Sequence, residues 1–259
     1  MASRIIVVTG AAGCIGRAIT RLFIEQGDLV VGLDINKKSI SEFTQELQNG
    51  RHSFIPAVID ITNETAVIEK MNDIERNIGP INTLVNNAGG NITTLLSETS
   101  SKEWLADIEL NLNAAFYTTK AVLSFMESRL KGNIINIGSV NGLSIFGDPG
   151  YSAAKAGLIN FTKFVATEYG SKGVRANIIC PGSVATKAWK DMHTKKPDLF
   201  NKFNSLCSLN KITTPEDVAE LVRFTASKAA RAMNGSTLVL DAGLTAGIPS
   251  VMATFTNSQ

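Results

Sequence analysis

Seven short runs rich in Val, Ile and Leu alternate with segments of helical periodicity along the whole chain, and this alternation limits the possible folds most strongly. The runs lie near residues 5–9, 29–34, 54–59, 83–86, 133–138, 175–180 and 237–241. Apolar strands that alternate with helices form a parallel sheet with both faces covered. The sequence therefore predicts an α/β fold with a doubly wound, seven-stranded parallel sheet and helices on both faces.

Composition is consistent with one large α/β domain over residues 1–259. The chain has 259 residues, 44% of them hydrophobic, and 21 glycines. It contains no Pro/Ser-rich linker, charge block or internal repeat. Right-handed crossovers bring the carboxyl ends of all strands to one edge of the sheet. Six polar or turn-forming residues are expected at that edge: Gly10, Asp34, Asp60, Asn87, Ser139 and Pro181.

A glycine-containing loop, Gly10 to Gly16, connects the first strand, Ile5 to Thr9, with a helical pattern that begins near Ile19. Glycines at this place allow backbone amides and the positive end of a helix to approach a pyrophosphate. A tight turn without a ligand is the alternative. The position of the loop directly after a buried strand favours a Rossmann-like dinucleotide site.

The second strand ends at Asp34, where a carboxylate accepts hydrogen bonds from an adenosine ribose. A 2′-phosphate at this place would be repelled, so Asp34 favours NAD, with NADP less favoured. Lys37 and Lys38 follow closely and could partly offset that repulsion. Asp34 could also be the N-cap of the next helix, and the two roles are compatible.

Tyr151 and Lys155 lie four residues apart in a predicted helix and therefore share one face of it. A tyrosine has a pKa of about 10, and a nearby ammonium would lower this pKa by stabilising the anion. A decrease of about three units needs roughly 4 kcal/mol, which one charge at about 4 Å can supply. The spacing also occurs by chance, with the tyrosine half-buried and the lysine solvated. Combined with the dinucleotide site, the spacing predicts that Tyr151 and Lys155 form an acid–base pair.

Together these motifs resemble the short-chain dehydrogenase/reductase family from Arg4 to about Gly247. The residues that carry the resemblance are Thr9 to Gly16, Asp34, Asp60, Asn86 to Gly89, Asn111, Ser139, Tyr151, Lys155, Pro181, Gly182 and Thr186. The resemblance implies an NAD-dependent oxidoreductase that interconverts a secondary alcohol and a ketone by hydride transfer. The alternatives are an NADPH-dependent 3-oxoacyl reductase and, from another class, a non-catalytic dinucleotide-binding redox sensor.

The resemblance assigns four catalytic residues. Ser139 would hold the substrate oxygen, and Tyr151 would exchange a proton with it. Lys155 would bind the nicotinamide ribose and lower the tyrosine pKa, and Asn111 would anchor a water that links Lys155 to solvent. Simpler alternatives are that Asn111 bonds backbone groups at a helix irregularity and that Ser139 ends a strand.

The resemblance also implies which residues bind the cofactor. Asp60 and Ile61 would contact the adenine, Asn87 to Gly89 would form a turn beside the adenosine half, and Val184 and Thr186 would hold the nicotinamide amide and the phosphate side. The full expected set is Gly10, Gly13, Cys14, Ile15, Gly16, Asp34, Asp60, Ile61, Asn87, Ala88, Gly89, Tyr151, Lys155, Pro181, Gly182, Val184 and Thr186.

Two positions depart from the family pattern. Cys14 stands where the loop usually has glycine, so a Cβ lies near the diphosphate; we expect binding to survive in weakened form. A thiol at a helix N-terminus can have a lowered pKa, which makes oxidative inactivation at Cys14 a hypothesis. Ser139 precedes Tyr151 by twelve residues instead of the commoner thirteen. A shorter loop explains the spacing, and Ser139 is preferred over Gly138 and Ser144.

Residues 187–212 are predicted to form a mobile substrate lid over the nicotinamide. Trp189, Met192, Phe200 and Phe203 are spaced like one side of a helix. Packing of these aromatic residues on their own domain or on a neighbouring subunit is an equal alternative. The candidate substrate residues are Asn91, Ile92, Leu143, Phe146, Trp189 and Met192.

Charge and cysteine usage exclude several classes. A net charge of +2 offers no basic field for nucleic acid. No apolar run approaches the roughly 18 residues of a membrane span, and no signal-peptide pattern precedes the first strand. The three cysteines show no metal spacing, and His52 and His193 are expected at the surface, so no metal site is predicted. These features favour a cytoplasmic protein.

Two long predicted helices, Trp104 to Leu130 and Tyr151 to Tyr169, are apolar on more than one side. Helices of this kind often pair across a two-fold axis. Resemblance to the family implies a homotetramer, with a dimer next, and the tail after Gly247 could cross to another subunit. The expected partners are thus further copies of the chain and a small-molecule alcohol or ketone substrate.

Overall fold

The computed structural model describes residues 3–47, 53–91, 95–186, 194–195 and 197–247. Its seven strands all lie within two residues of the predicted ranges. They are β1 (Ile5–Thr9), β2 (Leu29–Asp34), β3 (Phe54–Val58), β4 (Ile81–Asn86), β5 (Gly132–Ile137), β6 (Val174–Pro181) and β7 (Thr237–Leu240).

The helices alternate with the strands. They are α1 (Cys14–Glu25), α2 (Lys37–Leu47), α3 (Glu64–Asp73), α4 (Ser101–Ile108), α5 (Ala114–Ser128), α6 (Pro149–Tyr169), α8 (Pro197–Asn204) and α9 (Pro215–Ala226). The long helix predicted over 104–130 is therefore α4 and α5, joined by a π-helical segment, Glu109–Asn113.

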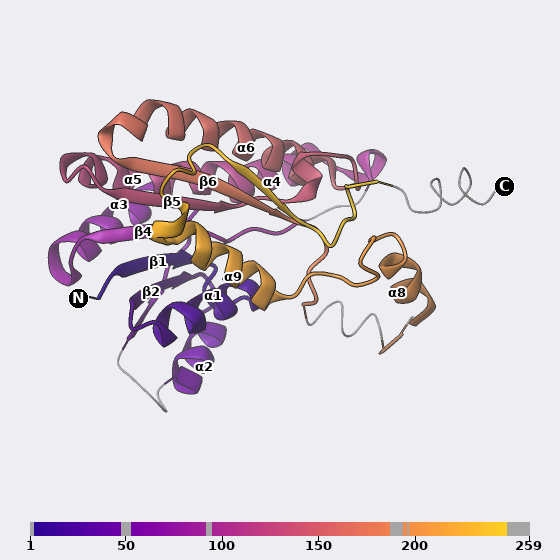
Figure 1. Cartoon of the computed structure of the whole chain (residues 1–259), viewed down its shortest axis with the longest axis horizontal. Coiled ribbons are helices and arrows are strands. Elements are labelled where there is room, and N and C mark those ends of the chain that lie inside the picture. The colour runs from indigo at the N-terminus through magenta and orange to yellow at the C-terminus, as the bar shows by residue number, and fades with distance from the viewer. Residues whose placement is uncertain (1–2, 48–52, 92–94, 187–193, 196, 248–259) are drawn as a thin grey trace.

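All seven strands are parallel, in the order β3-β2-β1-β4-β5-β6-β7 (Figure 1). The order reverses direction between β1 and β4, which is the switch point where such sheets bind ligands. Every residue of β1 and of β5 is buried, as expected for central strands covered on both faces. The predicted doubly wound, Rossmann-like sheet is confirmed.

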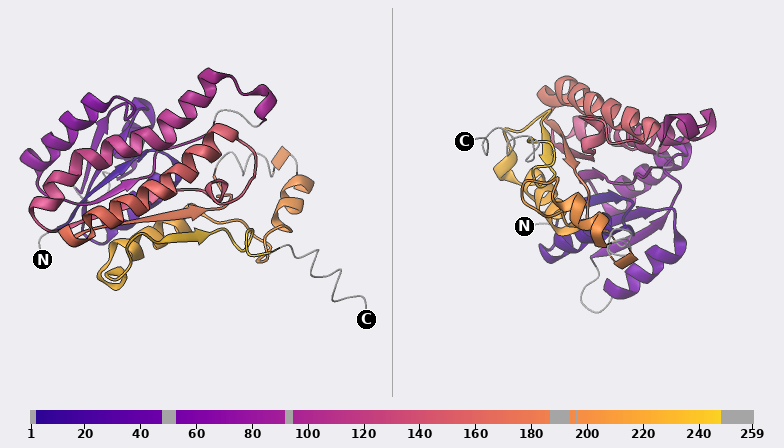
Figure 2. Two further views of the ribbon diagram at one scale, coloured as in Figure 1. Left: turned by 90° about the horizontal axis from the view of Figure 1, so that it is seen from above. Right: turned by 90° about the vertical axis from the view of Figure 1, so that its right-hand side faces the viewer.

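The two faces of the sheet have separate apolar cores. Val7, Leu84 and Ile134 belong to a core that includes residues of α3, α5 and α6. Their chain neighbours Val8 and Val85 point to the opposite face, where α1 and α9 complete the second core. Figure 2 shows helices on both sides of the sheet. Complete burial of side chains of this size contributes about 1.5–3 kcal/mol each.

A chain of buried polar side chains joins β4 and β5 to the helices above them. The amide nitrogen of Asn86 donates to Oδ1 of Asn136 at 2.8 Å, and that of Asn136 donates to Oγ1 of Thr162 at 2.8 Å. Thr118 donates to Oδ1 of Asn86 at 2.7 Å. Asn86 thus does more than fill a turn: it holds the carboxyl ends of β4 and β5 in register with α5 and α6.

The later part of the predicted lid, 187–212, contains α8, which lies beyond the carboxyl edge of the sheet (Figure 1). Cys207 is buried after this helix, and the amide of Leu209 donates to the carbonyl of Ala242 at 3.1 Å. Trp189 and Met192 lie outside the described residues. Mobility of the lid stays a prediction.

Candidate active site

The loop from Gly10 to Gly16 requires glycine at its two ends. Gly10 has φ +62°, and a Cβ there would lie 2.9 Å from the Cα of Ala88. A Cβ on Gly16 would overlap the carbonyl oxygen of Gly10. The loop therefore folds tightly onto itself and onto the turn after β4, and it leads directly into the N-terminus of α1.

Asn87 ties the turn after β4 to this loop. The Oγ1 atom of Thr9 accepts hydrogen bonds from the amides of Asn87 and Ala88, each at 3.0 Å. The Asn87 side chain donates to the carbonyls of Thr9 and Gly10, at 2.9 and 3.2 Å. Two segments about 80 residues apart are thus fixed side by side at the edge of the sheet.

A set of adjoining cavities runs along the carboxyl edge of the strands. The largest, of about 410 Å³, lies at the N-terminus of α1 and includes Cys14 in its lining. A cavity of about 80 Å³ lies beside Asp34, Asp60 and Ile61, and another of about 130 Å³ lies beside Ser139 and Tyr151. The three share lining residues, and together they take in every residue of the expected cofactor set.

This arrangement fits a dinucleotide. The 80 Å³ cavity combines apolar walls with the two carboxylates, and together with the adjoining part of the largest cavity, which shares Asp34 and Ile35 with it, it suits an adenosine. The middle of the cleft lies at a helix N-terminus, where amides and the helix dipole favour a pyrophosphate. The exposed Cys14 is the first residue of that helix and lines this part of the cleft.

The N-cap role expected for Asp34 belongs to Asn36, whose Oδ1 accepts a hydrogen bond from the amide of Ser39 at 3.0 Å, and the contact of Asp34 with a ribose stays a prediction. Asp34 itself binds two backbone amides. Its Oδ2 accepts a hydrogen bond from the amide of Ala12, and its Oδ1 accepts one from the amide of Asn36, each at 2.9 Å. The carboxylate therefore orders the cofactor loop and the start of α2. It also lines the cleft, where a ribose can contact it.

Ser139, Tyr151 and Lys155 meet at the 130 Å³ cavity. Ser139 follows β5, whereas Tyr151 and Lys155 lie one turn apart in α6. Nζ of Lys155 lies 5.5 Å from the centre of the Tyr151 ring and donates to the carbonyl of Ile137 at 2.9 Å. The helical spacing read from the sequence therefore places both side chains at the end of the cleft.

The pKa directions are set mainly by burial. Burial raises the pKa of Tyr151, while a hydrogen bond with Ser139 acts in the opposite direction. Burial also lowers the pKa of Lys155 to about 8. The lowering of the tyrosine pKa expected from the sequence is therefore not the direction found: loss of solvent around the phenol is the largest cause, and the nearby Asp148 and Asp107 also raise the pKa of Tyr151. Tyr151 holds its proton at neutral pH, and Lys155 is mostly protonated there.

Ser139 is the side chain at this strand end that reaches the cavity. A Cβ on Gly138 would lie 2.9 Å from Sγ of Cys180, so this position has no room for a side chain. Oγ of Ser139 accepts a hydrogen bond from the amide of Asn141 at 3.2 Å, which orients the hydroxyl. The structure thus supports the choice of Ser139 over Gly138.

Asn111 lies in the π-helical segment and bonds backbone groups, as in the simpler of its two interpretations. Its amide nitrogen donates to the carbonyls of Gly90 and Asp107, and its Oδ1 accepts from the amide of Gly90 at 3.1 Å. It is nevertheless close to Lys155: a Cβ on Gly89 would lie 2.8 Å from Oδ1 of Asn111 and 3.2 Å from Nζ of Lys155. The water link expected at Asn111 stays a prediction.

Some cleft residues were not predicted. Ile35 lies directly after Asp34 and is exposed at the adenine end, and Leu110 lines the same part of the cleft from the π-helical segment. Ile35 could have been predicted to line the cleft, because it directly follows a carboxylate at the end of a strand. No sequence signal marked Leu110, because the π-helical turn that presents it shifts the helical periodicity.

The structure does not bring all of the candidate substrate residues together at the cleft. Leu143 and Phe146 are exposed in the loop before α6, and neither lines the three cleft cavities. The Asn91 amide donates to Oδ2 of Asp148 at 2.9 Å and thereby ties two loops near the cleft. Ile92, Trp189 and Met192 lie outside the described residues.

Within the described part of the chain, no group of three or more His, Cys, Asp or Glu side chains is arranged to hold a metal ion. His52 and His193 are not among the described residues. No described helix is both long and apolar enough to cross a membrane.

Comparison with known proteins agrees with this geometry. The family model "short chain dehydrogenase" matches residues 4–197. The chain is 33% identical to a 7alpha-hydroxysteroid dehydrogenase of Bacteroides fragilis, with 96% of this chain and 97% of that protein covered. It is 32% identical to the 3-oxoacyl-(acyl-carrier-protein) reductase FabG of Thermotoga maritima, with 93% and 97% covered.

A solved structure has the same fold. An oxidoreductase of the short chain dehydrogenase/reductase family from Burkholderia thailandensis superposes with a TM-score of 0.92 at 38% identity, covering 99% of this chain and 98% of that one. Fold, cleft and sequence all agree, and the chain belongs to the short-chain dehydrogenase/reductase family of oxidoreductases.

Proposed function

We propose that this protein is an NAD-dependent dehydrogenase that interconverts a secondary alcohol and a ketone. The observation that carries the proposal is the meeting of Ser139, Tyr151 and Lys155 at one end of a dinucleotide-shaped cleft. A redox sensor that only binds the cofactor does not need a buried lysine beside a half-buried tyrosine. Such burial costs stability and is typical of catalytic sites.

The nicotinamide cofactor, when bound, supplies or accepts the hydride. Ser139 holds the substrate oxygen, and Tyr151 transfers a proton at its phenolic oxygen. Because the pKa of Tyr151 is raised, the phenol is ready to protonate a carbonyl oxygen during reduction. In the oxidative direction Tyr151 first releases its own proton to solvent, and the resulting tyrosinate, stabilised by the protonated Lys155, accepts the proton of the alcohol.

Asp34 supports the choice of NAD. Its carboxylate lines the adenosine end of the cleft, where a 2′-phosphate would meet a like charge. The 3-oxoacyl reductase alternative would instead use NADPH. It has support in the similarity to FabG, so cofactor preference separates the two proposals.

The first experiment combines cofactor binding with turnover. Purified protein and the Tyr151→Phe variant are titrated with NADH and NADPH by fluorescence and then assayed with a panel of secondary alcohols and ketones, including hydroxysteroids, by nicotinamide absorbance. We expect NADH affinity to change less than about twofold in the variant and kcat to fall by about 10²–10⁴. Tyr117→Phe, at a half-buried tyrosine that lines none of the three cleft cavities, is the matched control.

Three outcomes would contradict the proposal. Turnover by Tyr151→Phe at the wild-type rate would remove the tyrosine from the reaction. Preference for NADPH would favour the reductase alternative. Tight cofactor binding without turnover of any substrate in the panel would favour the sensor.

Two further properties belong to the proposal. We place the enzyme in the cytoplasm, because three unpaired cysteines suit a reducing compartment. The residues expected to select the substrate are in and near the lid, so the panel of alcohols, and not the fold, has to identify the substrate.

A further inference from the structure

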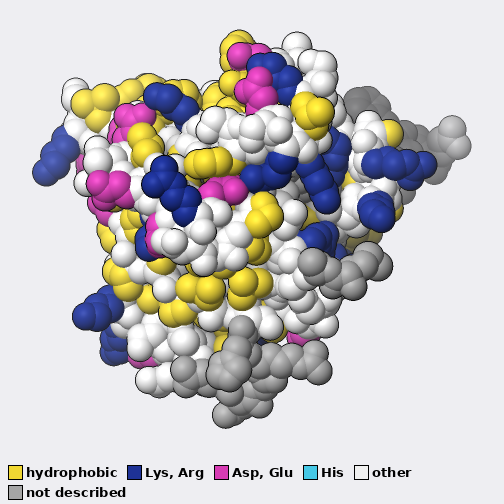
Figure 3. Space-filling view, turned by 90° about the vertical axis from the view of Figure 1, so that its left-hand side faces the viewer, with side chains coloured by type: hydrophobic (Ala, Val, Ile, Leu, Met, Phe, Trp, Pro, Cys, Tyr) yellow, Lys and Arg dark blue, Asp and Glu magenta, His cyan; other side chains and the backbone are white. Residues whose placement is uncertain are grey.

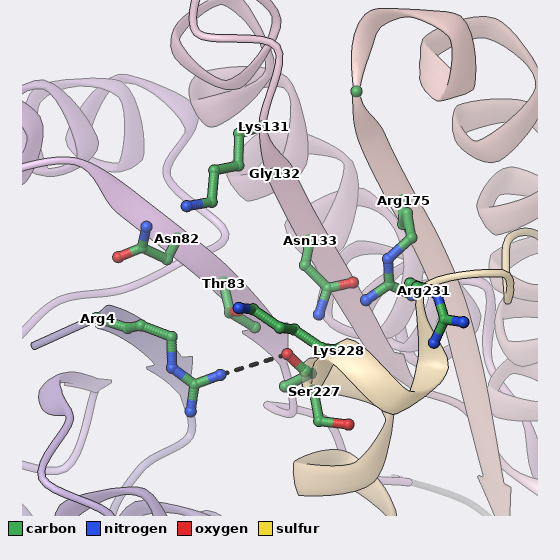
Figure 4. Close-up of a pocket in the computed structure, with 12 residues that line it drawn as sticks. Arg4, Asn82, Thr83, Lys131, Gly132, Asn133, Arg175, Ser227, Lys228 and Arg231 are labelled. Atoms are coloured by element: carbon green, nitrogen blue, oxygen red, sulfur yellow. Dashed lines mark hydrogen bonds between the residues drawn. The ribbon is translucent and has the colours of Figure 1, made fainter. Parts of the chain in front are cut away.

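A second cavity lies at the opposite edge of the sheet, where the strands begin. It has a volume of about 340 Å³. Its floor is a row of paired residues across three strands: Thr83 of β4 is in register with Asn133 of β5, which is in register with Arg175 of β6. The connection that follows α9 covers one side, with Ser227, Lys228 and Arg231 facing the cavity (Figure 4).

The lining of this cavity is strongly basic. Its charged residues are Arg4, Lys131, Arg175, Lys228 and Arg231, and it includes no Asp or Glu. Figure 3 faces this edge of the molecule and shows Lys and Arg side chains grouped near its centre. Five positive charges in one cavity are notable in a chain whose net charge is only +2.

Most of this charge has no carboxylate partner among the described residues. Arg4 pairs with Asp28. Arg175 donates to the backbone carbonyls of Thr225, Ala230 and Met233, which hold the guanidinium in place but leave its charge uncompensated. The ammonium of Lys131 forms no ion pair with a described residue, and the same holds for Lys228 and Arg231.

Asn133 provides an independent indication of a ligand. Its side chain is directed into the cavity from β5 (Figure 4), and the residue is only 6% exposed. Both its amide nitrogen and its amide oxygen are buried and have no hydrogen-bond partner in the described structure. Buried amides are nearly always bonded, so an unbonded one at the wall of a cavity calls for a partner. A water molecule would satisfy the amide but would not balance the four cations that lack a carboxylate partner among the described residues.

We propose that this cavity is a binding site for a small molecule that carries two or more phosphate groups. Guanidinium groups match phosphate oxygens in geometry, and lysine binds them as a point charge. The cations come from separate elements around the cavity, which suits more than one anionic group. The volume is at the lower end of the range for small-molecule sites, about 300–1,000 Å³, so the ligand is compact. The site is separate from the cofactor cleft, which lies at the other edge of the sheet.

Calorimetric titration with inorganic pyrophosphate tests the proposal. The full-length protein is first saturated with its preferred nicotinamide cofactor, so that the cleft is filled. We expect one-site binding that weakens as salt is added. The double variant Lys228→Gln/Arg231→Gln should bind pyrophosphate at least tenfold more weakly. The double variant Lys102→Gln/Lys211→Gln loses the same charge at exposed positions outside the cavity, and its affinity should stay within twofold of the wild type.

A second variant tests, without any ligand, whether the cavity has an excess of positive charge. Asn133→Asp places a carboxylate among the uncompensated cations. We expect its unfolding temperature at low salt to equal or exceed that of the wild type and its pyrophosphate affinity to fall at least tenfold. A clear decrease in its unfolding temperature would show that the cavity has no excess of positive charge, and this would overturn the proposal.

Other results would overturn the site itself. These are the absence of a one-site isotherm, an equal loss of affinity in the control pair, or pyrophosphate binding that the cofactor abolishes. Citrate that binds as tightly as pyrophosphate would overturn the assignment to phosphate groups. Binding of heparin without binding of pyrophosphate would show that the surface serves long polyanions instead.

Discussion

At the scale of single residues, burial of the Lys155 ammonium lowers the stability of the fold, whereas the proposed reaction requires that charge. Its side chain is fully buried and its folded-state pKa is about 8, against an ordinary value of 10.5. Because this pKa is lowered, the unfolded chain binds the proton more tightly than the folded one. The resulting penalty is fully present below about pH 8 and disappears as the pH rises to about 10.5. It is on the order of 3 kcal/mol.

Lys155→Met should therefore inactivate the enzyme and stabilise it at neutral pH. The variant also loses the hydrogen bond from Nζ to Ile137, about 1 kcal/mol at any pH, so we expect a net gain of about 2 kcal/mol at pH 7 that turns into a net loss of about 1 kcal/mol above pH 10.5. Urea unfolding at both pH values measures the gain, with Lys163→Met, at an exposed site, as the control. Equal destabilisation at both pH values would show that the buried charge carries no penalty.

A second prediction at this scale concerns cofactor choice at Asp34. Asp34→Asn keeps the size of the side chain and an oxygen that can accept a hydrogen bond from Ala12 or Asn36, but removes the charge that repels a 2′-phosphate. We expect the ratio of NADP⁺ to NAD⁺ activity, as kcat/KM, to rise at least tenfold, or by about 1.4 kcal/mol. Asp60→Asn, at the same end of the cleft, is the control and should leave the ratio unchanged.

At the scale of elements, the buried amides of Asn86 and Asn136 hold the catalytic edge together. Asn136→Ala removes two side-chain hydrogen bonds of 2.8 Å between β4, β5 and α6. We expect the free energy of unfolding to fall by about 2–4 kcal/mol, because each such bond contributes about 1 kcal/mol and partners left unbonded cost more. Denaturant titration measures the loss. Asn77→Ala, which removes an exposed bond to Asp73, should cost less than about 0.5 kcal/mol.

At the scale of the whole molecule, α4, α5 and α6 carry apolar side chains that the described chain does not cover. Phe164 is 62% exposed and Leu105 is 63% exposed, and Phe116, which packs edge-on against Phe161, is 40% exposed. The three helices lie on one side of the sheet (Figure 2). An apolar surface of this kind is typical of a subunit interface, so it supports the homotetramer expected from the family resemblance, and we propose that these helices pair in it.

Phe164→Glu places a charge on this surface and should dissociate the tetramer into dimers without a change in secondary structure. Light scattering after size-exclusion chromatography measures the mass, and circular dichroism checks the fold. Val58→Glu, at an exposed apolar residue on the edge strand β3, is the control and should leave the mass unchanged. A wild-type protein that is already monomeric would contradict the assembly.

Local patterns in the sequence were sufficient for the fold and for most of the cleft. Strand positions follow from short apolar runs, and the meeting of Tyr151 with Lys155 at the cleft follows from the spacing of a helix. Both patterns depend on near neighbours in the chain. Because parallel strands bring their carboxyl ends to one edge, residues such as Asp34, Asn87 and Pro181 could be placed together in advance. Cavities along that edge include all of them.

Only the tertiary structure decided properties that depend on contacts between distant segments. The raised pKa of Tyr151 arises from the residues that bury it, and the role of Asn111 depends on Gly90, which lies 21 residues earlier. The basic cavity likewise combines Arg4 with Asn133 and Arg231. Burial and charge density are sums over neighbours in space, so the sequence determined the scaffold and the identity of the reacting groups, and folding determined their protonation and the second cavity.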